Sequence, residues 1–117
     1  MCSSDLRMNS QEEVETAAVV RDLLVRRAKN HAKWGPQHHP GGAFLKGPTG
    51  GTWQVVGAHL ENIARTQLEK HHSVSWSAIL AEEVGEALVA GTPEQIRSEL
   101  LDVAAVCIAW AEDIDRS

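Results

Sequence analysis

The sequence predicts an all-α fold made of four helices. Alanine and leucine are abundant, tyrosine is absent and runs of β-branched residues are short. Apolar residues recur at the spacing of an amphipathic helix in four stretches, which turn or capping residues separate. The predicted helices cover residues 11–33, 53–71, 75–90 and 93–115. A chain of 117 residues is long enough for one domain with a single core.

The predicted domain spans residues 11–117, because residues 1–10 show no periodic pattern and are expected to form a disordered tail. Ser10 can cap the first helix, and Glu13 stands where a capping box places its acid. The start of this helix is acidic and its end basic, which suits the helix dipole. A helix beginning near residue 11 is therefore expected.

The stretch 34–52 is predicted to be a long loop. It holds six glycines and three prolines, which exclude regular structure. Its 19 residues exceed a normal connection between helices. Structureless loops of this length are usually functional lids or disordered, so this loop is a candidate for closing over a ligand.

The last two predicted helices carry clear start signals. Ser75 can cap the third helix. At the fourth, Thr92 can be the N-cap, Pro93 occupies the first helical position and Gln95 completes a capping box. The turn between them is tight, so the two helices are expected to be antiparallel neighbours.

These two helices each carry a pair of carboxylates three residues apart, and such residues are neighbours on a helix surface. Glu83 falls inside the apolar stripe of its helix and Glu99 inside the stripe of the next. Glu86 and Asp102 lie at the stripe edges, and Glu82 lies further out. The two stripes consist of Trp76, Ile79, Leu80 and Ala87, and of Ile96, Leu100, Val103, Cys107, Trp110 and Ile114.

Carboxylates turned toward a core must be neutralised, because burying an isolated charge destabilises the folded protein by several kcal/mol. Neither acidic motif contains a basic residue, so the four acids call for a cation. Magnesium and manganese prefer oxygen ligands. Zinc fits less well, because neither cysteine nor histidine converges with these acids.

Composition excludes several classes of function. No apolar run approaches the ~18 residues of a membrane helix, and the N-terminus lacks the features of a secretory signal. Cys2 and Cys107 do not form a disulfide framework, which fits a reducing compartment. The net charge of −5 argues against a nucleic-acid partner. We therefore expect a cytoplasmic protein that binds neither membrane nor nucleic acid.

The acidic motifs also carry a family resemblance. Glu82-Glu83-Val-Gly-Glu86 and, after twelve residues, Glu99-Leu-Leu-Asp102 resemble the signature of the MazG-like all-α nucleoside triphosphate pyrophosphohydrolases. Three flanking pieces are similar to small single-domain members of bacteria and phages: Ala32-Lys-Trp-Gly-Pro-Gln37 followed by His39-Pro40, Trp76-Ser-Ala-Ile-Leu80, and Asp102-Val-Ala-Ala-Val106 followed by Ala109-Trp110. The similarity covers about residues 11–115.

This resemblance implies a four-helix MazG-like bundle that hydrolyses nucleoside or deoxynucleoside triphosphates to the monophosphate and pyrophosphate. It implies Mg²⁺, or Mn²⁺, as the cofactor and assembly into a homodimer or homotetramer. Glu82 and Glu83 would be the catalytic acids. The metal ligands would be Glu83, Glu86, Glu99 and Asp102.

The substrate contacts are less clearly marked. Trp34 and Trp76 can stack on a base, although Trp76 also suits core packing. Gln37 and His39, with His38, can read a base or close over phosphate. Relatives place a phosphate-binding residue just beyond the last motif acid, where this chain has only Ala105, Val106, Cys107 and Ala109. Candidates for binding phosphate from elsewhere in the chain are Lys33, Lys46, Arg65 and Lys70.

Two other interpretations remain open. The first is a non-catalytic helical module that binds nucleotides or a partner protein, which the missing phosphate ligand favours. The second is a di-iron carboxylate bundle, suggested by Glu69-x-x-His72. A di-iron site needs that motif on two helices, and the sequence contains one copy.

Overall fold

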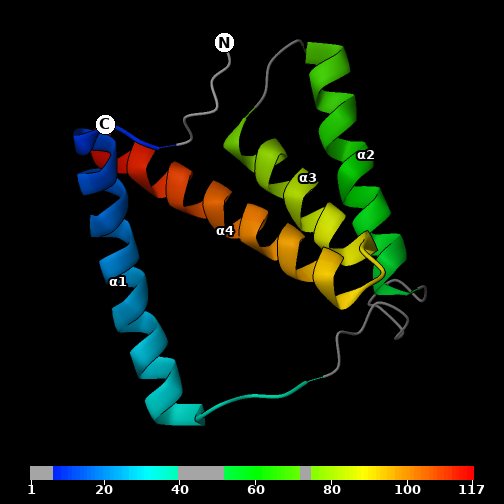
Figure 1. Ribbon diagram of the computed structural model, residues 1–117. Helices are drawn as coiled ribbons and strands as arrows, with labels where there is room; N and C mark the ends of the chain where they lie inside the picture. Colours follow the sequence, from blue (N-terminus) through cyan, green and yellow to red (C-terminus); the bar gives the residue numbers. More distant parts are fainter. Residues whose placement is uncertain (1–6, 40–51, 72–74) are drawn as a thin grey trace. The chain divides into compact units, whose positions relative to one another are not determined.

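The computed structural model describes residues 7–39, 52–71 and 75–117. These residues form four helices and no strand: α1 (Ser10–Trp34), α2 (Trp53–His71), α3 (Trp76–Val89) and α4 (Pro93–Arg116) (Figure 1). The all-α prediction is confirmed, and each predicted helix end lies within one residue of the observed one. Among the described residues, no helix has the length and apolarity to cross a membrane. Most of the predicted tail and loop lies outside the described residues.

Side-chain caps begin α3 and α4 as predicted. The backbone N–H of Ala78 donates to Ser75 Oγ at 3.1 Å. At α4, the N–H of Gln95 donates to Thr92 Oγ1 at 3.1 Å, and the N–H of Thr92 donates to Gln95 Oε1 at 3.3 Å. This reciprocal pair is a capping box, so the sequence pattern located both helix starts.

The predicted cap of α1 is wrong by one residue. Asn9, not Ser10, is the N-cap: the N–H of Glu12 donates to Asn9 Oδ1 at 2.8 Å. In return, the N–H of Asn9 donates to Glu12 Oε2 at 2.9 Å, so Glu12 rather than Glu13 completes the capping box. Asparagine and serine are almost equally good caps, and an acid follows each of them by three residues.

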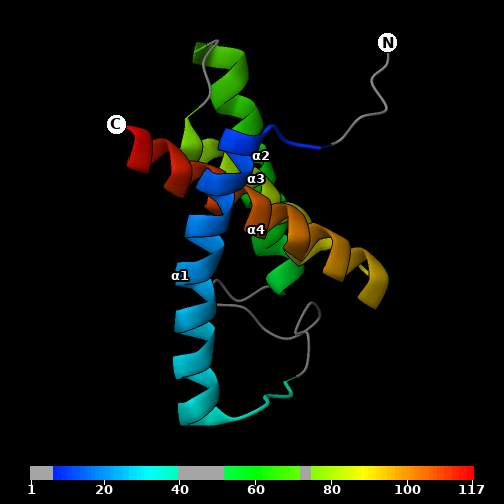
Figure 2. The same cartoon turned by 60° about the vertical axis from the view of Figure 1, so that its left-hand side comes forward.

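The chain divides into two compact units. One contains α1 and the C-terminal end of α4 from Ile108, and the other contains α2, α3 and the preceding part of α4. α4 is one unbroken helix from its gold start to its red end (Figure 2). A single domain over residues 11–117 stays a prediction.

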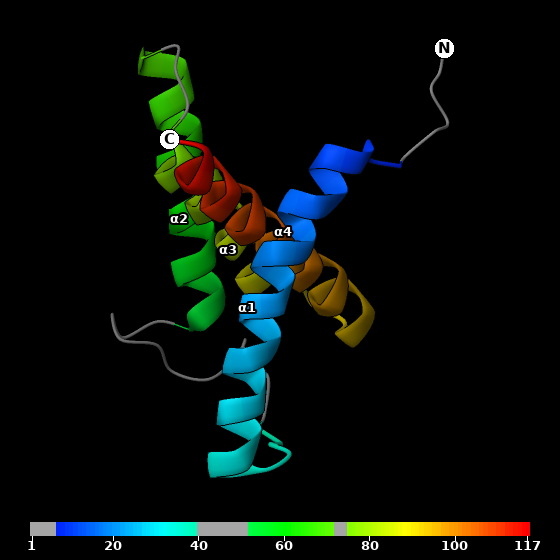
Figure 3. The same ribbon diagram turned by 90° about the vertical axis from the view of Figure 1, so that its left-hand side faces the viewer.

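In the first unit, α1 is held to the end of α4 by polar contacts. Thr16 Oγ1 donates to Glu112 Oε2 at 3.0 Å, and Arg116 Nη1 donates to Glu15 Oε2 at 2.7 Å. α1 continues as a regular helix well beyond these contacts (Figure 3). No residue of α1 is fully buried.

In the second unit, α2 and α3 pack side by side with their backbones in close approach (Figure 1). A Cβ atom at Gly85 would lie 2.6 Å from the carbonyl oxygen of Gly57, and one at Gly57 would lie 2.7 Å from that of Gly85. Both glycines are buried, as are Ala64 on α2 and Ala78 on α3. Small residues therefore set how close these helices come.

We predict that Gly85→Ala destabilises the protein. Alanine favours the helix by about 1 kcal/mol, but its methyl group would meet the backbone of α2, and overpacking costs about 1–3 kcal/mol. Because the methyl group would lie 2.6 Å from a backbone oxygen, the overpacking cost should be at the upper end of that range, and a net loss of about 2 kcal/mol is expected in urea unfolding. Gly91→Ala is the control, because a Cβ there has no atom within 4 Å. Equal stability of Gly85→Ala and the wild type would show that the close approach is not required.

Candidate metal centre

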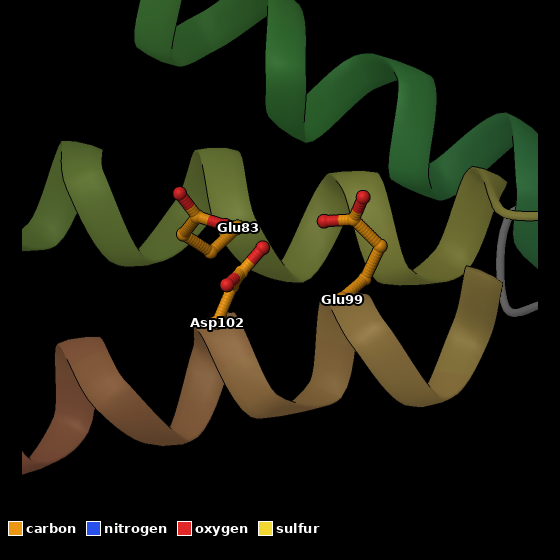
Figure 4. A group of neighbouring side chains, drawn as sticks. All are labelled: Glu83, Glu99 and Asp102. Carbon is orange, nitrogen blue, oxygen red and sulfur yellow. The ribbon is translucent and has the colours of Figure 1, made fainter. Parts of the chain in front are cut away.

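Three carboxylates converge between α3 and α4. One oxygen each of Glu83, Glu99 and Asp102 lies within 4.8 Å of the other two. Figure 4 shows Glu83 extending from α3 and the other two side chains rising from α4 into the space between the helices. The sequence spacing thus brings acids from both motifs together.

The fourth acid of the motifs, Glu86, belongs to the same cluster. Glu83 and Glu99 both act on the pKa of Glu86, and Glu86 in turn acts on the pKa of Glu83. Asp102 is the charge with the largest effect on Glu83. Glu83 on α3 lies opposite Asp102 on α4 (Figure 4). We call Glu83, Glu86, Glu99 and Asp102 the acidic cluster.

The burial of the acids follows the prediction on α3. Glu83 and Glu86 are half-buried, whereas Glu82 is exposed. On α4, Glu99 is half-buried and Asp102 is exposed. The cluster is therefore partly shielded from solvent at Glu83 and Glu99, and it is open to solvent at Asp102.

The predicted apolar stripe of α4 is only partly correct. Ile96, Val103 and Trp110 are half-buried as expected, and Val106 joins them. Leu100, Cys107 and Ile114 are exposed. The helix carries apolar residues on two adjacent sides, so the pattern alone does not show which side turns toward α3. The side of α4 that turns toward α3 is the one that contains Glu99.

Two oxygens of the cluster are buried without a partner. Glu83 Oε2 and Glu99 Oε2 are inaccessible to solvent and make no hydrogen bond. Leaving a buried polar group unsatisfied costs about 1–3 kcal/mol, and more when it is charged. Within residues 7–39, 52–71 and 75–117, no basic side chain forms an ion pair with these acids. A structural salt-bridge network therefore lacks its cations here.

The electrostatics of the cluster are repulsive. Burial, followed by the charges of Asp102, Glu99 and Glu82, raises the pKa of Glu83 above its ordinary value of 4.5, against a lowering by the hydrogen bond to Glu86. Burial, the charge of Glu83 and the hydrogen bond to Glu99 raise the pKa of Glu86 to about 7. Since the charges acting on both groups are negative, the metal-free cluster keeps a proton near neutral pH.

The donor set fits a hard divalent cation. All the converging atoms are carboxylate oxygens, which Mg²⁺ and Mn²⁺ prefer. Ligand oxygens of an octahedral magnesium lie about 3–4 Å apart, so small side-chain rotations would bring these three into range. The two unsatisfied oxygens would then gain the partner they lack.

The predicted substrate residues divide between the two units. Lys33 and Trp34 end α1 in the first unit, where Lys33 Nζ lies 4.9 Å from the centre of the Trp34 ring. Trp34 is 61% exposed, and Gln37 is exposed as well. Trp76 is half-buried in the second unit, on the same side of α3 as Glu83 and two turns before it. His39 is exposed.

The cations expected to hold phosphate are not part of the cluster. Arg65 forms an ion pair with Glu61, at 3.4 Å, within α2. Lys70 is exposed, and Lys46 lies outside the described residues. Beyond Asp102, Ala105 and Cys107 are exposed and nonpolar or weakly polar, as the sequence indicated.

One positioning residue escaped the sequence interpretation. Gly85 stands inside the acidic motif, and its contact with Gly57 fixes α3 against α2. The signal was present, because a glycine in a helix interior costs about 1 kcal/mol relative to alanine. Such a residue between two glutamates indicates that another backbone comes close.

Comparisons with known protein families, with curated proteins and with solved structures find no match for this chain. The assignment of the site therefore depends on its residues and their geometry.

We predict that Mg²⁺ or Mn²⁺ stabilises the protein, by about 2.7 kcal/mol at a concentration of 100 times Kd. Glu99→Gln should remove this gain because it removes a ligand. Without metal, the same variant should be as stable as the wild type or more stable, since one repelling charge is lost. Thermal unfolding with EDTA and with each metal measures both effects. Glu69→Gln, an exposed acid on α2, is the control and should keep the full gain.

A salt-bridge role for the cluster would give the opposite result. Glu99→Gln would then destabilise the protein in EDTA, and added metal would leave the wild-type melting temperature unchanged.

We also predict that the metal-free protein loses stability as the pH rises from about 4.5 to about 7. In that range the folded state binds more protons than the unfolded state, because the pKa of Glu86 is raised to about 7. The free energy of unfolding therefore falls with increasing pH. Urea unfolding in EDTA between pH 5 and 8 measures the slope. Glu86→Gln should flatten it, whereas Glu69→Gln should not, and equal slopes for all three proteins would contradict the prediction.

Proposed function

We propose that this protein is a MazG-like nucleoside triphosphate pyrophosphohydrolase of the cytoplasm. It would hydrolyse nucleoside or deoxynucleoside triphosphates to the monophosphate and pyrophosphate. The observation that carries the proposal is the pair of buried, unsatisfied oxygens on Glu83 and Glu99 within a cluster of four acids. The resemblance of both acidic motifs to that superfamily supplies the reaction.

In this proposal Glu83, Glu86, Glu99 and Asp102 hold Mg²⁺, or Mn²⁺. The bound metal would screen the charge of the triphosphate and lower the pKa of a bound water. An acidic site can accept a polyphosphate only when a cation inverts its charge. The open side at Asp102 would be the side from which the phosphates approach, because Asp102 is the exposed ligand.

Glu82 is the residue we assign to the attacking water. It is exposed and is not among the converging acids, yet its charge raises the pKa of both Glu83 and Glu86. A carboxylate at that position can orient a water and accept its proton. Glu83 would act beside it as a ligand that fixes the geometry.

The nucleotide would be held by residues outside the cluster. Among the described cations, Lys33, Arg65 and Lys70 are our candidates for contacts with the phosphates, and Lys46 is a further candidate. Trp34 and Trp76 would stack on the base, and Gln37 and His39 would contact its edge or the phosphates. The support for these roles is the resemblance of the segments that contain them, together with the exposure of Trp34.

The resemblance also leads us to propose a homodimer or a homotetramer. Family members place their sites near subunit interfaces, so a neighbouring copy would cover the open side of the cluster and supply cations to it.

A non-catalytic nucleotide-binding module is the second candidate. It is favoured by one observation, the lack of any cation at Ala105, Val106, Cys107 and Ala109, directly beyond Asp102. Such a protein would bind a triphosphate with Mg²⁺ and release no product.

Pyrophosphate release from a panel of nucleoside and deoxynucleoside triphosphates with Mg²⁺ tests the proposal. Turnover is expected with at least one substrate. Glu83→Gln and Asp102→Asn should each lower kcat at least about 100-fold, because a bound metal supplies several kcal/mol of transition-state stabilisation. The matched control is Glu94→Gln, an exposed acid at the start of α4, which should leave the rate unchanged.

Binding without turnover, measured by calorimetry with the same panel, would reject the enzyme and favour the non-catalytic module. A visible absorption spectrum of bound iron would instead favour the di-iron interpretation, for which Glu69 is exposed and His72 lies outside the described residues.

A further inference from the structure

One side of α2 contacts the last two turns of α3. Gln54, Gly57 and Glu61 lie on that side, because they follow one another at intervals of three and four residues. Gln54 Nε2 donates to the carbonyl oxygen of Val89 at 2.9 Å. Val89 is the last residue of α3, and a carbonyl at the end of a helix has no donor within its own helix. Gln54 therefore holds the end of α3 against the first turn of α2.

The contact next to this hydrogen bond leaves no room for another side-chain atom. A Cβ atom at Gly57 would lie 2.7 Å from the carbonyl oxygen of Gly85 and 2.7 Å from Leu88 Cβ. One at Gly85 would lie 2.9 Å from Glu61 Cγ and 3.0 Å from the backbone nitrogen of Glu61. The bare backbone of Gly85 is thus the part of α3 that fits against α2 here.

This contact also sets the rotation of α3 about its own axis. At about 100° per residue, Glu82 and Leu88 each lie about 60° from Gly85, one to either side of it. A rotation of α3 in either direction would bring one of these side chains toward the backbone of Gly57. The side of α3 that contains Gly85 therefore stays turned to α2, and Glu83, about 200° from Gly85, stays turned away from it.

The acids converge only within a narrow range of this rotation. One oxygen each of Glu83, Glu99 and Asp102 lies within 4.8 Å of the other two (Figure 4). Side-chain ends lie about 5–6 Å from a helix axis, so a rotation of about 20° moves them by about 2 Å. The ligands of a metal site have to be held within about 0.5 Å of their productive positions. A small rotation of α3 would thus take Glu83 out of the site.

We propose that Gln54 and Gly57 are positioning residues of the acidic cluster. α2 contributes no acid to the cluster, yet these two residues hold α3 in the rotation that turns Glu83 toward Glu99 and Asp102. Metal affinity therefore depends on a helix that supplies no ligand. This role rests on the proposed metal centre and does not depend on the hydrolysis reaction.

Calorimetric titration of the full chain with Mn²⁺ tests the proposal. Gly57→Ala should weaken Mn²⁺ binding at least about tenfold, because its methyl group has to displace the backbone of α3 and residues that orient metal ligands have effects of this size. Gln54→Met should weaken binding about threefold, because it keeps the length of the side chain and removes the donor to Val89.

Ser75→Ala is the matched control. It removes the cap of α3 and the hydrogen bond to Gln67, at the opposite end of α3 from Val89. This variant should lower the urea midpoint and leave the Mn²⁺ affinity unchanged. Variants of Gly57 and Gln54 would behave in the same way if these residues only stabilised the fold, so the Mn²⁺ affinity separates the two roles. Far-UV circular dichroism checks that each variant is folded, and Gln54→Met decides the test if Gly57→Ala is not.

A crystal structure of metal-free Gly57→Ala provides a second readout. The carboxylate oxygens of Glu83 should lie more than 4.8 Å from those of Glu99 or Asp102. Unchanged convergence, or unchanged Mn²⁺ affinity of the folded variant, would overturn the positioning role and leave the metal centre in place. A wild type that binds no Mn²⁺ would overturn both, whereas Mn²⁺ binding without turnover would reject only the enzyme.

Discussion

The close approach of Gly57 and Gly85 is the constraint on which the candidate site depends. At each glycine, the carbonyl oxygen of the other glycine lies where a side chain would begin. α2 therefore packs against the side of α3 that contains Gly85 and Ala78. At about 100° per residue, Glu83 lies on the opposite side of α3, about 200° from Gly85. α2 thus occupies one side of α3 and leaves the carboxylates to face α4. A side chain at either glycine would separate the helices or rotate α3, and either change would move Glu83 away from Asp102.

The acidic cluster occupies a position that a simple helical domain would fill with apolar side chains. Glu83 and Glu99 are half-buried, and each leaves an oxygen without a partner, so the contact between α3 and α4 is weakened by the residues at its centre. Proteins keep such an arrangement when a ligand compensates for it. Binding free energy that becomes available only in the folded state is also folding free energy. A metal in this cluster would therefore stabilise the contact between the two helices as well as serve any chemistry there.

The sequence predicted the helices well because their signals are local. Periodicity located the four segments, and the caps at Ser75 and Thr92 gave their starts to within one residue. The convergence of acids from the two helices was also predicted, because carboxylates in an apolar stripe are conspicuous. The errors arose where two options are locally equal, as with Asn9 and Ser10, or where α4 offers two apolar sides and only packing selects one. Gly85 was overlooked because its role depends on Gly57, which is 28 residues away in the sequence.

Protons and a metal ion would compete for the same oxygens of the cluster. Without metal, burial and the repulsion among the acids favour a bound proton, and together they raise the pKa of Glu86 to about 7. A divalent cation relieves the same repulsion, and it must displace that proton in order to bind. Metal affinity should therefore increase with pH up to about 7 and level off above it. The same carboxylates thus make the metal-free protein sensitive to pH and would make the site selective for a cation. Both properties arise from uncompensated negative charge between α3 and α4.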